Sequence, residues 1–278
     1  MNKGILIVGK GFIGERLRAA LDCQITDTFI RSFSDAEKII KKYKPKVIIN
    51  CIGITGKRNV DDCELQKEET LLANSFVPVI LAEAALRNNV KLVHISTGCM
   101  FNYDYDKDKP IKEESKNYFF DLFYSRSKMY SDVALEALSR KYNILITRIR
   151  IPLLDKPHPK NIIDKLIRYK KIIDVPNSVT YIPDFIQAVK YLIKIDAQGI
   201  YNVVNKGGLR YPRLMRIYQR YAPEFKFLII PLKKVGVRTN LILSTAKLEK
   251  SGFKVRNINS VLEECVKGYI EESSRRND

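Results

Sequence analysis

Gly4-Ile-Leu-Ile-Val-Gly-Lys-Gly-Phe-Ile-Gly14 joins a short apolar run to three glycines spaced as Gly-x-Gly-x-x-Gly. A helical pattern from Glu15 to Leu21 follows directly, so the stretch predicts a strand, a tight turn and a helix. Such a turn brings a helix N-terminus toward an anion, typically the pyrophosphate of a dinucleotide. The alternative is a glycine turn that binds no ligand. The residues expected to bind the dinucleotide are Gly9, Lys10, Gly11, Phe12, Ile13 and Gly14.

The same alternation of apolar runs and helical patterns continues along the first half of the chain. Further strands are expected at 46–50, 91–95 and 144–149, and helices at 34–43, 68–88 and 124–142. Alternating strands and helices are typical of a parallel sheet with helices on both faces. The predicted fold class is therefore α/β, a Rossmann-type doubly wound parallel sheet with a smaller C-terminal substrate-binding lobe.

The pattern becomes less regular and richer in loops after Arg150. A helix at 184–193 and a strand at 199–204 then resemble sheet elements again, so the domain boundary is expected to be discontinuous. We predict a dinucleotide-binding domain over residues 1–150 that is rejoined by about 176–206. Residues 151–175 and 207–278 are predicted to form the substrate-binding lobe.

Composition excludes several classes of protein. No apolar run approaches the roughly 18 residues of a membrane span and no signal peptide is evident, so we expect a cytoplasmic protein with no membrane partner. The five cysteines are scattered without a CxxC pair, which favours free thiols and no metal site. The net charge of +18 comes from dispersed lysines without a nucleic-acid-binding motif, so no nucleic-acid partner is expected.

The residues about 20 positions after the glycines bear on the choice of cofactor. NAD-binding folds usually carry an acidic residue about 20 residues after the glycines, to hold the ribose 2′-hydroxyl. Here Phe29-Ile-Arg-Ser-Phe33 supplies Arg31 and Ser32 instead. A guanidinium suits a 2′-phosphate, and Lys10 adds positive charge, so the expected cofactor is NADPH/NADP, with NADH possible. The alternative is that Arg31 is merely solvated.

A tyrosine and a lysine four residues apart indicate the chemistry. In Tyr124-Ser-Arg-Ser-Lys128 the spacing places phenol and ammonium on one face of the predicted helix. The lysine charge is expected to lower the phenol pKa and so favour proton transfer. Upstream, the strand Val93-His-Ile-Ser-Thr97 ends in hydroxyls that can hold a carbonyl oxygen at the carboxyl edge of the sheet.

Taken together, these strings resemble one group of short-chain dehydrogenase/reductases across nearly the whole chain. That group reduces 4-keto-6-deoxy sugar nucleotides: it is the dTDP-4-dehydrorhamnose reductase group, most closely the plant bifunctional 3,5-epimerase/4-reductases of UDP-L-rhamnose synthesis. The matching strings are 53–64, 96–101, 117–120, 123–128, 148–152, 161–165, 175–180, 238–240 and 246–248.

The resemblance implies a reductase triad of Thr97, Tyr124 and Lys128. Thr97 and Tyr124 would hold the C4 oxygen, Tyr124 would give the proton, and Lys128 would hold the nicotinamide ribose. The epimerase pair of the family falls on Cys99 and Lys165. A free cysteine is often a small buried residue, a lysine is often solvated, and His158 is a rival acid or base for the same step.

Other matching residues are expected around the ligands. Asn50 and Gly53 resemble the loop that runs past the cofactor, and Asn74 is expected to be a buried helical amide that supports the site. For each of these residues an ordinary surface or capping role is the alternative. The expected substrate contacts, besides Thr97, are Asn117, Arg150, Asn177 and Arg238.

The leading hypothesis is a 3,5-epimerase/4-reductase that converts NDP-4-keto-6-deoxyglucose to NDP-L-rhamnose, with UDP favoured and dTDP possible. The alternatives are a monofunctional dTDP-4-dehydrorhamnose reductase, a reductase similar to GDP-fucose synthase, or a non-catalytic NADP-binding regulatory subunit. The partner is then a small-molecule nucleotide sugar, and the resemblance implies a homodimer formed through a four-helix face that includes the Tyr124 helix.

Overall fold

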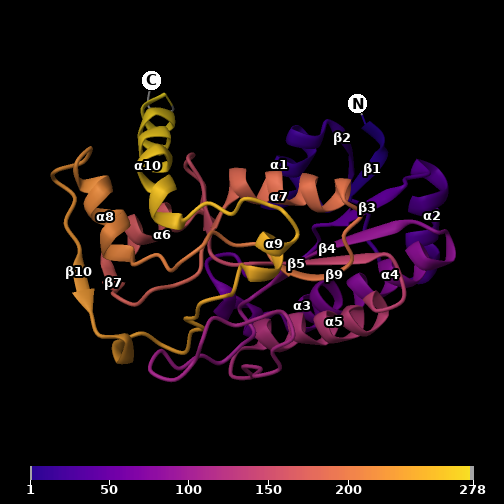
Figure 1. The fold of residues 1–278 in the computed structure, drawn as a ribbon, viewed down its shortest axis with the longest axis horizontal. Helices are drawn as coiled ribbons and strands as arrows, with labels where there is room; N and C mark the ends of the chain where they lie inside the picture. The colour runs from indigo at the N-terminus through magenta and orange to yellow at the C-terminus, as the bar shows by residue number, and fades with distance from the viewer. Residues whose placement is uncertain (1, 276–278) are drawn as a thin grey trace. The chain divides into compact units, whose positions relative to one another are not determined.

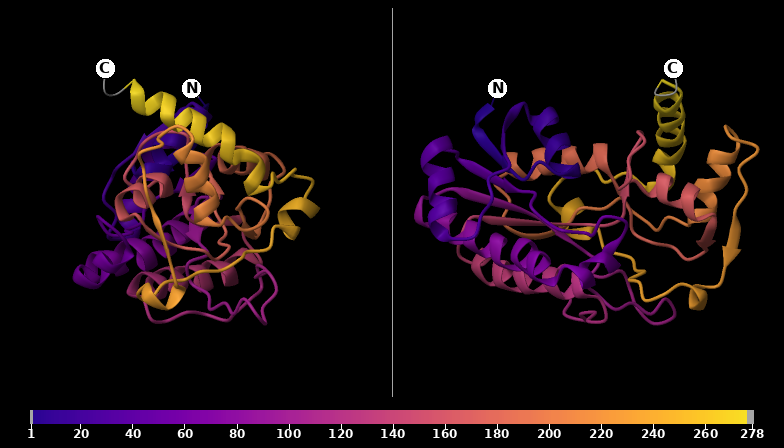
Figure 2. Two further views of the ribbon diagram at one scale, coloured as in Figure 1. Left: turned by 90° about the vertical axis from the view of Figure 1, so that its left-hand side faces the viewer. Right: turned by 180° about the vertical axis from the view of Figure 1, so that it is seen from behind.

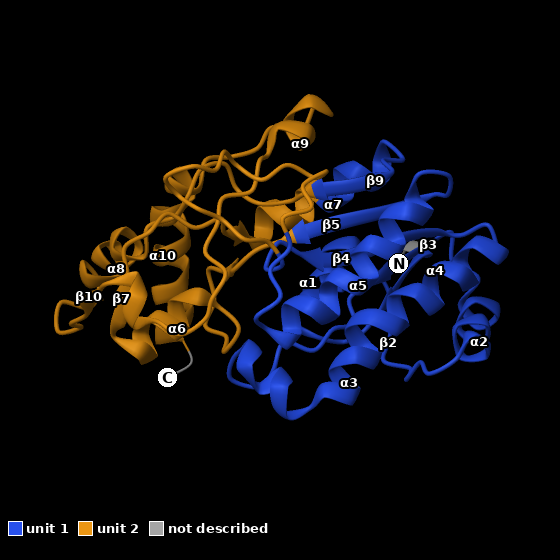
Figure 3. Ribbon diagram, turned by 90° about the horizontal axis from the view of Figure 1, so that it is seen from below, with its two compact units in different colours: residues 1–100, 118–148, 189–201 blue, residues 101–117, 149–188, 202–278 orange. Residues whose placement is uncertain are grey.

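A computed structural model describes residues 2–275, and these divide into two compact units. Figure 3 colours them separately. Unit 1 comprises residues 1–100, 118–148 and 189–201, and unit 2 comprises 101–117, 149–188 and 202–278. The predicted boundaries assign 101–117 and 176–188 to the nucleotide-binding part instead. Segment 101–117 packs in unit 2 because Asn202 donates to the Ile111 carbonyl and to Glu113.

Unit 1 is built on one six-stranded sheet with the order β2-β1-β3-β4-β5-β9 (Figure 1). The pairs β1–β2, β1–β3 and β3–β4 are parallel, and the interior strands are apolar because both faces are covered. The predicted Rossmann-type parallel sheet is thus confirmed. Its strands are β1 (Asn2–Val8), β2 (Cys23–Thr26), β3 (Val47–Asn50), β4 (Lys91–Thr97), β5 (Ile144–Ile149) and β9 (Gly199–Asn202).

Helices cover the sheet of unit 1 on both sides. Figure 1 shows α1 on one face and α4 and α5 on the other, and the views of Figure 2 agree. The predicted helix 68–88 is continuous but contains a π-helical turn, where one extra residue per turn is accommodated. The helices are α1 (Phe12–Leu21), α2 (Phe33–Tyr43), a 3₁₀ helix (Val60–Leu65), α3 (Lys67–Leu71), the π turn (Leu72–Phe76), α4 (Val77–Arg87) and α5 (Phe123–Ser139).

The combined helix Lys67–Arg87 is long and apolar enough to cross a membrane by length and composition alone. Half of its most apolar window is buried inside the structure, where α4 packs against α2 and α5. The core helix of a soluble protein passes the same test, so this single helix is weak evidence for a span.

Unit 2 has a separate hydrophobic core. Helix α6 (Ile162–Tyr169) presents a strongly one-sided apolar face, and α8 (Tyr211–Gln219) and α10 (Ile258–Ser274) pack around the same cluster. The remaining elements are β6 (Pro152–Leu153), β7 (Lys171–Ile173), β8 (Thr180–Tyr181), α7 (Ile182–Lys194, which continues into unit 1), β10 (Leu228–Ile230), a 3₁₀ turn (Leu232–Lys234) and α9 (Ala246–Lys250).

Candidate active site

The glycine loop between β1 and α1 has the geometry of an anion-binding turn. Gly9 has a φ of +106°, and a side chain there would press on the backbone N of Ile52. A Cβ on Gly14 would lie 2.0 Å from the Gly9 carbonyl oxygen, so helix and loop pack too closely for any other residue. Gly11, the N-cap of α1, faces open space instead. The loop therefore leaves room for a pyrophosphate at the helix N-terminus.

The remaining loop residues lie around this turn. Lys10 is exposed, while Phe12 and Ile13 are half-buried in the first turn of α1. The guanidinium of Arg16 lies 3.9 Å from the centroid of the Phe12 ring and donates to the Phe12 carbonyl. Phe12 and Ile13 thus contribute backbone and packing, and Lys10 is the residue whose charge is free to face solvent.

The end of β2 carries an acidic residue that the sequence pattern did not reveal. Strand β2 ends at Thr26, and Asp27 follows it directly with its carboxylate accepting from the backbone N of Lys10 at 3.3 Å. The expectation that this position lacks an acid is therefore wrong. The residues that meet the ribose 2′ group are predicted at Arg31 and Ser32, because the four residues of β2 form no apolar run and their strand is not predicted.

Arg31 and Ser32 instead lie at the start of α2. The Ser32 hydroxyl caps the helix in a reciprocal pair with Asp35, whose carboxylate also accepts from the backbone N of Arg31. These hydrogen bonds lower the pKa of Asp35. The guanidinium of Arg31 lies 4.6 Å from the centroid of the exposed Phe29 ring, so it is available to an anion.

The first turn of α5 is tied to the end of β4. The Ser125 hydroxyl donates to the Cys99 carbonyl at 2.5 Å, and the Cys99 backbone N donates to the Thr97 hydroxyl at 3.0 Å. Glu64 accepts from the backbone N of the first α5 residue, Phe123. Tyr124, Thr97 and Cys99 therefore lie on two segments that hydrogen bonds hold together at the carboxyl edge of the sheet.

Lys128 is buried one turn further along α5. Burial lowers its pKa to about 8, and the Asp132 carboxylate opposes that fall. A Cβ on Gly53 would lie 2.9 Å from the Lys128 Nζ, so the ammonium occupies space that only a glycine leaves. The structure thus brings Gly53 to the predicted catalytic lysine.

The π turn places Asn74 beside the same loop. Its side-chain amide accepts from the backbone N of Ile54 at 2.9 Å and donates to the Ile54 carbonyl and to Ser127. The Ser131 hydroxyl donates to the Asn74 carbonyl. Asn74 is therefore the buried supporting amide that the sequence suggested, fastening the loop that contains Gly53 to α5.

Asn50 is buried at the end of β3 and holds the start of this loop. Its side chain accepts from the backbone N of Ile52 and shares a 3.1 Å hydrogen bond with His94 Nδ1 on the neighbouring strand. Burial and the nearby Lys128 charge lower the pKa of His94 well below its ordinary value, so the ring is neutral. Asn50 thus positions the loop beside the glycine turn.

A buried ion pair lies beneath the Tyr124–Lys128 face of α5. Arg148 on β5 donates to Asp132 at 2.5 and 3.1 Å, and both side chains are fully buried. Ser96, the residue before Thr97, donates to the other Asp132 oxygen at 2.6 Å. Sequence reasoning missed this network, although Asp132 lies four residues after Lys128 and so on the same helix face.

Together these groups of unit 1 suit carbonyl chemistry. A phenol and a hydroxyl at one sheet edge can hold a ketone oxygen, and the buried ammonium of Lys128 stabilises negative charge that develops nearby. The glycine loop lies on the carboxyl end of β1 in the same sheet, where open α/β sheets bind their ligands. The residues can therefore bind a carbonyl and transfer a proton to it.

Unit 2 brings two of the predicted substrate residues together. The buried guanidinium of Arg150 donates to Asn177 at 2.7 Å and to the Thr239 carbonyl and hydroxyl at 2.8 and 3.0 Å. Arg238, next to Thr239, is exposed, as is Asn117, whose carbonyl accepts from the backbone N of Asn102. Arg150 and Asn177 form a rigid pair, whereas Arg238 and Asn117 lie on exposed loops.

Lys165 is on α6 of unit 2 and is half-buried. The preceding loop is folded on itself, since His158 Nδ1 accepts from the backbone N of Lys160 and Asp164 accepts from that of His158. Accepting at Nδ1 leaves the His158 proton on Nε2. The structure therefore gives Lys165 a helical position and His158 a local structural role.

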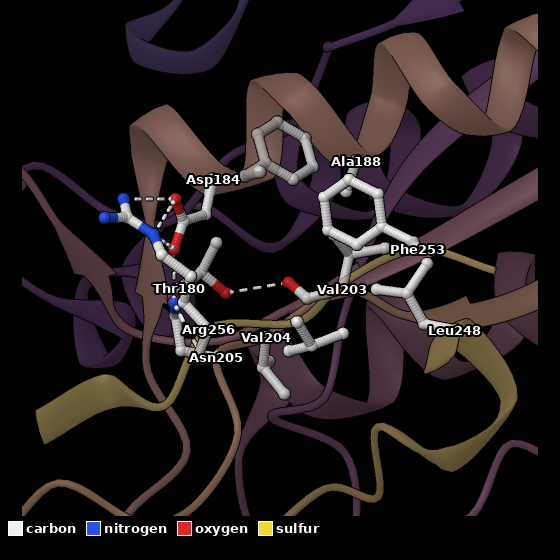
Figure 4. A pocket seen from close by; sticks show the side chains of 11 residues that line it. Thr180, Asp184, Ala188, Val203, Val204, Asn205, Leu248, Phe253 and Arg256 are labelled. Atoms are coloured by element: carbon white, nitrogen blue, oxygen red, sulfur yellow. Dashed lines mark hydrogen bonds and ion pairs between the residues drawn. The ribbon is translucent and has the colours of Figure 1, made fainter. Parts of the chain in front are cut away.

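A hollow elsewhere in unit 2 contains none of the predicted site residues. Figure 4 shows Arg256 turned toward Asp184, with which it pairs at 2.5 Å, and Thr180 donating to the Val203 carbonyl. Phe253 and Leu248 form its apolar side. Because its polar groups bond one another, this hollow is a packing feature rather than a candidate active site.

Comparison with known proteins fits this geometry. Residues 4–182 match the family model described as the RmlD substrate binding domain. The chain belongs to the RmlD substrate-binding family. An Arabidopsis thaliana relative named bifunctional dTDP-4-dehydrorhamnose 3,5-epimerase/dTDP-4-dehydrorhamnose reductase is 33% identical to this RmlD-family chain, over 88% of the chain and 86% of the relative.

Longer relatives of this RmlD-family chain also exist. Three Arabidopsis thaliana proteins are named trifunctional UDP-glucose 4,6-dehydratase/UDP-4-keto-6-deoxy-D-glucose 3,5-epimerase/UDP-4-keto-L-rhamnose-reductase. They are 31%, 32% and 33% identical to the chain over 85%, 76% and 76% of its length. The chain spans only about a third of each of these relatives, which is 36%, 33% and 33% of their lengths.

Solved structures share the fold of this RmlD-family chain. The L780 UDP-rhamnose synthase from Acanthamoeba polyphaga mimivirus superposes with a TM-score of 0.88 at 24% identity, covering 95% of this chain and 99% of that one. A dTDP-4-dehydrorhamnose reductase from Bacillus anthracis in complex with NADP gives a TM-score of 0.80 at 21% identity, covering 97% and 99%. At these identities the two structures support the fold.

Proposed function

We propose that the chain is an NADPH-dependent reductase of a nucleotide-linked 4-keto-6-deoxy sugar in rhamnose synthesis. One observation carries the proposal: hydrogen bonds through Cys99 join the first turn of α5, which contains Tyr124, to the end of β4 at Thr97. Both segments belong to the same unit as the glycine loop. An Arabidopsis thaliana relative that covers 88% of the chain is named as an epimerase and reductase of dTDP-4-dehydrorhamnose. The solved reductase of the same fold was crystallised with NADP.

The residues of unit 1 fit this cofactor. The open space at Gly11 and the close packing at Gly9 and Gly14 leave a cradle at the α1 N-terminus that a Cβ on Gly11 would enter. When bound there, NADPH supplies the hydride for the ketone carbon. Arg31 would bind the 2′-phosphate, and Lys128 would hold the nicotinamide ribose.

The side chains at the sheet edge would then handle the ketone oxygen. Thr97 and Tyr124 donate hydrogen bonds to it, and Tyr124 passes its proton to the oxygen as negative charge develops. The ammonium of Lys128 stabilises the resulting phenolate. In this proposal unit 1 binds the cofactor and carries the reductase triad, and unit 2 binds the nucleotide sugar. Buried Arg150 and Asn177 would hold the loop at Thr239, and the exposed Arg238 next to it would contact a phosphate or sugar group.

We further propose a 3,5-epimerase activity, with Cys99 and Lys165 as its acid and base. The protons on C3 and C5 of the sugar are acidic because both carbons flank the C4 ketone, and the enolate oxygen can be held by the reductase hydroxyls. Support comes from the relative named as both epimerase and reductase, which covers a similar length.

The test separates epimerisation from reduction. The chain is incubated in D₂O with UDP- or dTDP-4-keto-6-deoxyglucose and no NADPH, and deuterium entry at C3 and C5 is followed by NMR. Cys99→Ser and Lys165→Gln should each slow this exchange by about 10²–10⁴-fold. Reduction of the already epimerised 4-keto-L-rhamnose nucleotide should persist in both variants. The matched control is Lys170→Gln, at the exposed end of α6.

Two results would count against parts of the proposal. Without exchange in the unsubstituted protein, but with reduction of the epimerised substrate, the chain is a reductase alone. If no NADPH is oxidised with any of these substrates, the proposed reductase activity is wrong. We favour UDP over dTDP because three Arabidopsis thaliana relatives are named for UDP sugars, so kcat/KM should be higher for the UDP sugar.

We also propose a homodimer formed through the α5 face. Phe76, Tyr130 and Val133 are large apolar residues exposed on the π turn and on α5, which contact each other within unit 1. Sedimentation equilibrium should give twice the chain mass, and Val133→Glu should shift it toward the monomer, since the charge would be buried. Tyr169→Glu, at an exposed aromatic residue of unit 2, is the control. A monomeric unsubstituted protein at micromolar concentration contradicts this proposal.

A further inference from the structure

Residues 50–54, the β3 loop, form a wall shared by two parts of unit 1. On one side, a Cβ on Gly9 would lie 2.9 Å from the backbone N of Ile52, so the loop packs directly against the glycine turn. On the other side, a Cβ on Gly53 would lie 2.9 Å from the Lys128 Nζ. A small shift of the β3 loop therefore changes both the glycine turn and the space around the lysine ammonium.

Two buried amides hold the β3 loop at its two ends. At the far end, Asn74 accepts from the backbone N of Ile54 at 2.9 Å and donates to the Ile54 carbonyl. At the near end, Asn50 Oδ1 accepts from the backbone N of Ile52 at 3.0 Å, and Asn50 Nδ2 lies 3.1 Å from His94 Nδ1. The near end of the loop is therefore only as fixed as Asn50, whose orientation depends on His94.

These contacts determine which nitrogen of His94 carries the proton. Because Asn50 Oδ1 already accepts from the backbone, Asn50 Nδ2 has to donate to His94, so Nδ1 is the acceptor and the ring proton lies on Nε2. Burial and the Lys128 charge also hold the pKa of His94 well below its ordinary value, which keeps the ring neutral. One specific tautomer of His94 thus holds the β3 loop.

The other ring nitrogen of His94 makes no hydrogen bond. Nε2 is buried, and it has no partner among residues 2–275, which the structure describes. A buried donor without a partner destabilises a fold, and an apolar residue of similar size would avoid that penalty. The presence of a histidine here is therefore explained by the hydrogen bond that Nδ1 accepts rather than by how the ring packs.

We propose that His94 is a positioning residue: by accepting at Nδ1 it fixes Asn50, and through it the β3 loop, in the arrangement that serves both the glycine turn and Lys128. The inference rests on the proposed function, since it concerns the dinucleotide site and the lysine of that reductase. Without the acceptor, the buried Asn50 amide turns to find another partner and no longer accepts from the Ile52 N–H. The loop then occupies other positions, and only the molecules in the original arrangement bind NADPH with full affinity.

Two substitutions separate the hydrogen bond from the packing of the ring. His94→Leu fills a similar volume and offers no acceptor, whereas His94→Asn can place its Oδ1 where Nδ1 stood but leaves a cavity. The control is Lys91→Met at the amino end of the same strand, away from the site, where the Lys91 ammonium donates to buried and surface acceptors on Asn143 and Asp196. Each protein is measured by fluorescence titration with NADPH, by kcat and KM for reduction of the epimerised 4-keto sugar, and by urea denaturation.

His94→Leu should weaken NADPH binding by about 5- to 100-fold and also lower kcat, because both neighbours of the β3 loop are disturbed. His94→Asn should bind NADPH within about threefold of the unsubstituted chain, although its cavity lowers stability toward urea. Lys91→Met should lose stability while NADPH affinity and kcat are retained. If His94→Leu does not fold, Asn50→Leu/His94→Leu, which removes both ends of the hydrogen bond, should show the same weakened NADPH binding.

The possible contrary results bear on different statements. If His94→Asn binds NADPH no better than His94→Leu, or if Lys91→Met shows the same defect, His94 contributes to packing alone and its positioning role is wrong. The reductase proposal is then unaffected. If the unsubstituted chain neither binds NADPH nor reduces the 4-keto sugar, the proposed function fails, and the role of His94 fails with it.

Discussion

Tyr124→Phe lowers kcat/KM for reduction of the 4-keto sugar by about 10²–10⁴-fold, the usual contribution of a general acid. The ring of Tyr124 is buried, and the substitution keeps its volume, so the fold and the affinity for NADPH should be retained. The measurement pairs steady-state NADPH oxidation with fluorescence titration of the cofactor.

The control is Tyr142→Phe, which removes an exposed phenol just after α5. Loss of turnover in Tyr124→Phe alone supports the proton-donating role. Equal turnover in the Tyr124→Phe and unsubstituted proteins would remove Tyr124 from the mechanism. If the unsubstituted protein binds NADPH but reduces none of these substrates, the chain is better described as a regulatory subunit.

Asp132→Asn destabilises the protein by about 3–5 kcal/mol, because the buried guanidinium of Arg148 loses the carboxylate charge with which it pairs at 2.5 Å. The same change removes the charge that supports the Lys128 ammonium. Chemical denaturation measures the first effect, and the pH dependence of kcat measures the second.

The direction of the pH effect follows from the lysine. Reduction that needs cationic Lys128 falls as pH rises through its pKa of about 8. Without the Asp132 carboxylate that pKa drops further, so the falling limb of the kcat profile should move to lower pH. Asp132→Glu should return the fall of kcat to the pH at which it occurs in the unsubstituted protein.

A double variant separates stability from electrostatics. In Asp132→Asn/Arg148→Met the buried guanidinium is removed together with its partner carboxylate, so most of the stability should return while the fall of kcat with pH remains shifted. The control Glu136→Gln, one turn further along α5, should change neither quantity appreciably. If kcat of the double variant falls at the same pH as in the unsubstituted protein, Asp132 contributes to stability and does not affect the pKa of Lys128.

The fold could be predicted from sequence wherever a strand is a continuous apolar run. The run Val47-Ile-Ile49 satisfies that condition, and the strand expected at 46–50 matches β3 to within one residue. The strand Cys23–Thr26 does not, because it is short and half polar, and it was missed. The π turn within Lys67–Arg87 was also missed, since one extra residue barely alters helical periodicity.

The residues of the candidate site likewise divide into those that local sequence predicts and those that it does not. Local spacing pointed to Tyr124, Lys128 and the glycine loop, because each is a pattern of neighbouring residues. Asp27 went unrecognised because its meaning depends on where the unrecognised strand ends. The Asp132–Arg148 pair joins α5 to β5 across 16 residues, and only the packing of helix on sheet reveals it.

The order in which the chain leaves the ribosome constrains how unit 1 can form. Strand β9, which completes the sheet beside β5, ends at Asn202, after two excursions into unit 2 at 101–117 and 149–188. At about 5–20 residues per second, translation of the roughly 50 residues between the end of β5 and the start of β9 takes about 3–10 seconds. During that interval β5 is an unpaired edge strand, open to pairing with another nascent chain. Early folding of the unit 1 sheet therefore depends on keeping that edge covered until β9 arrives.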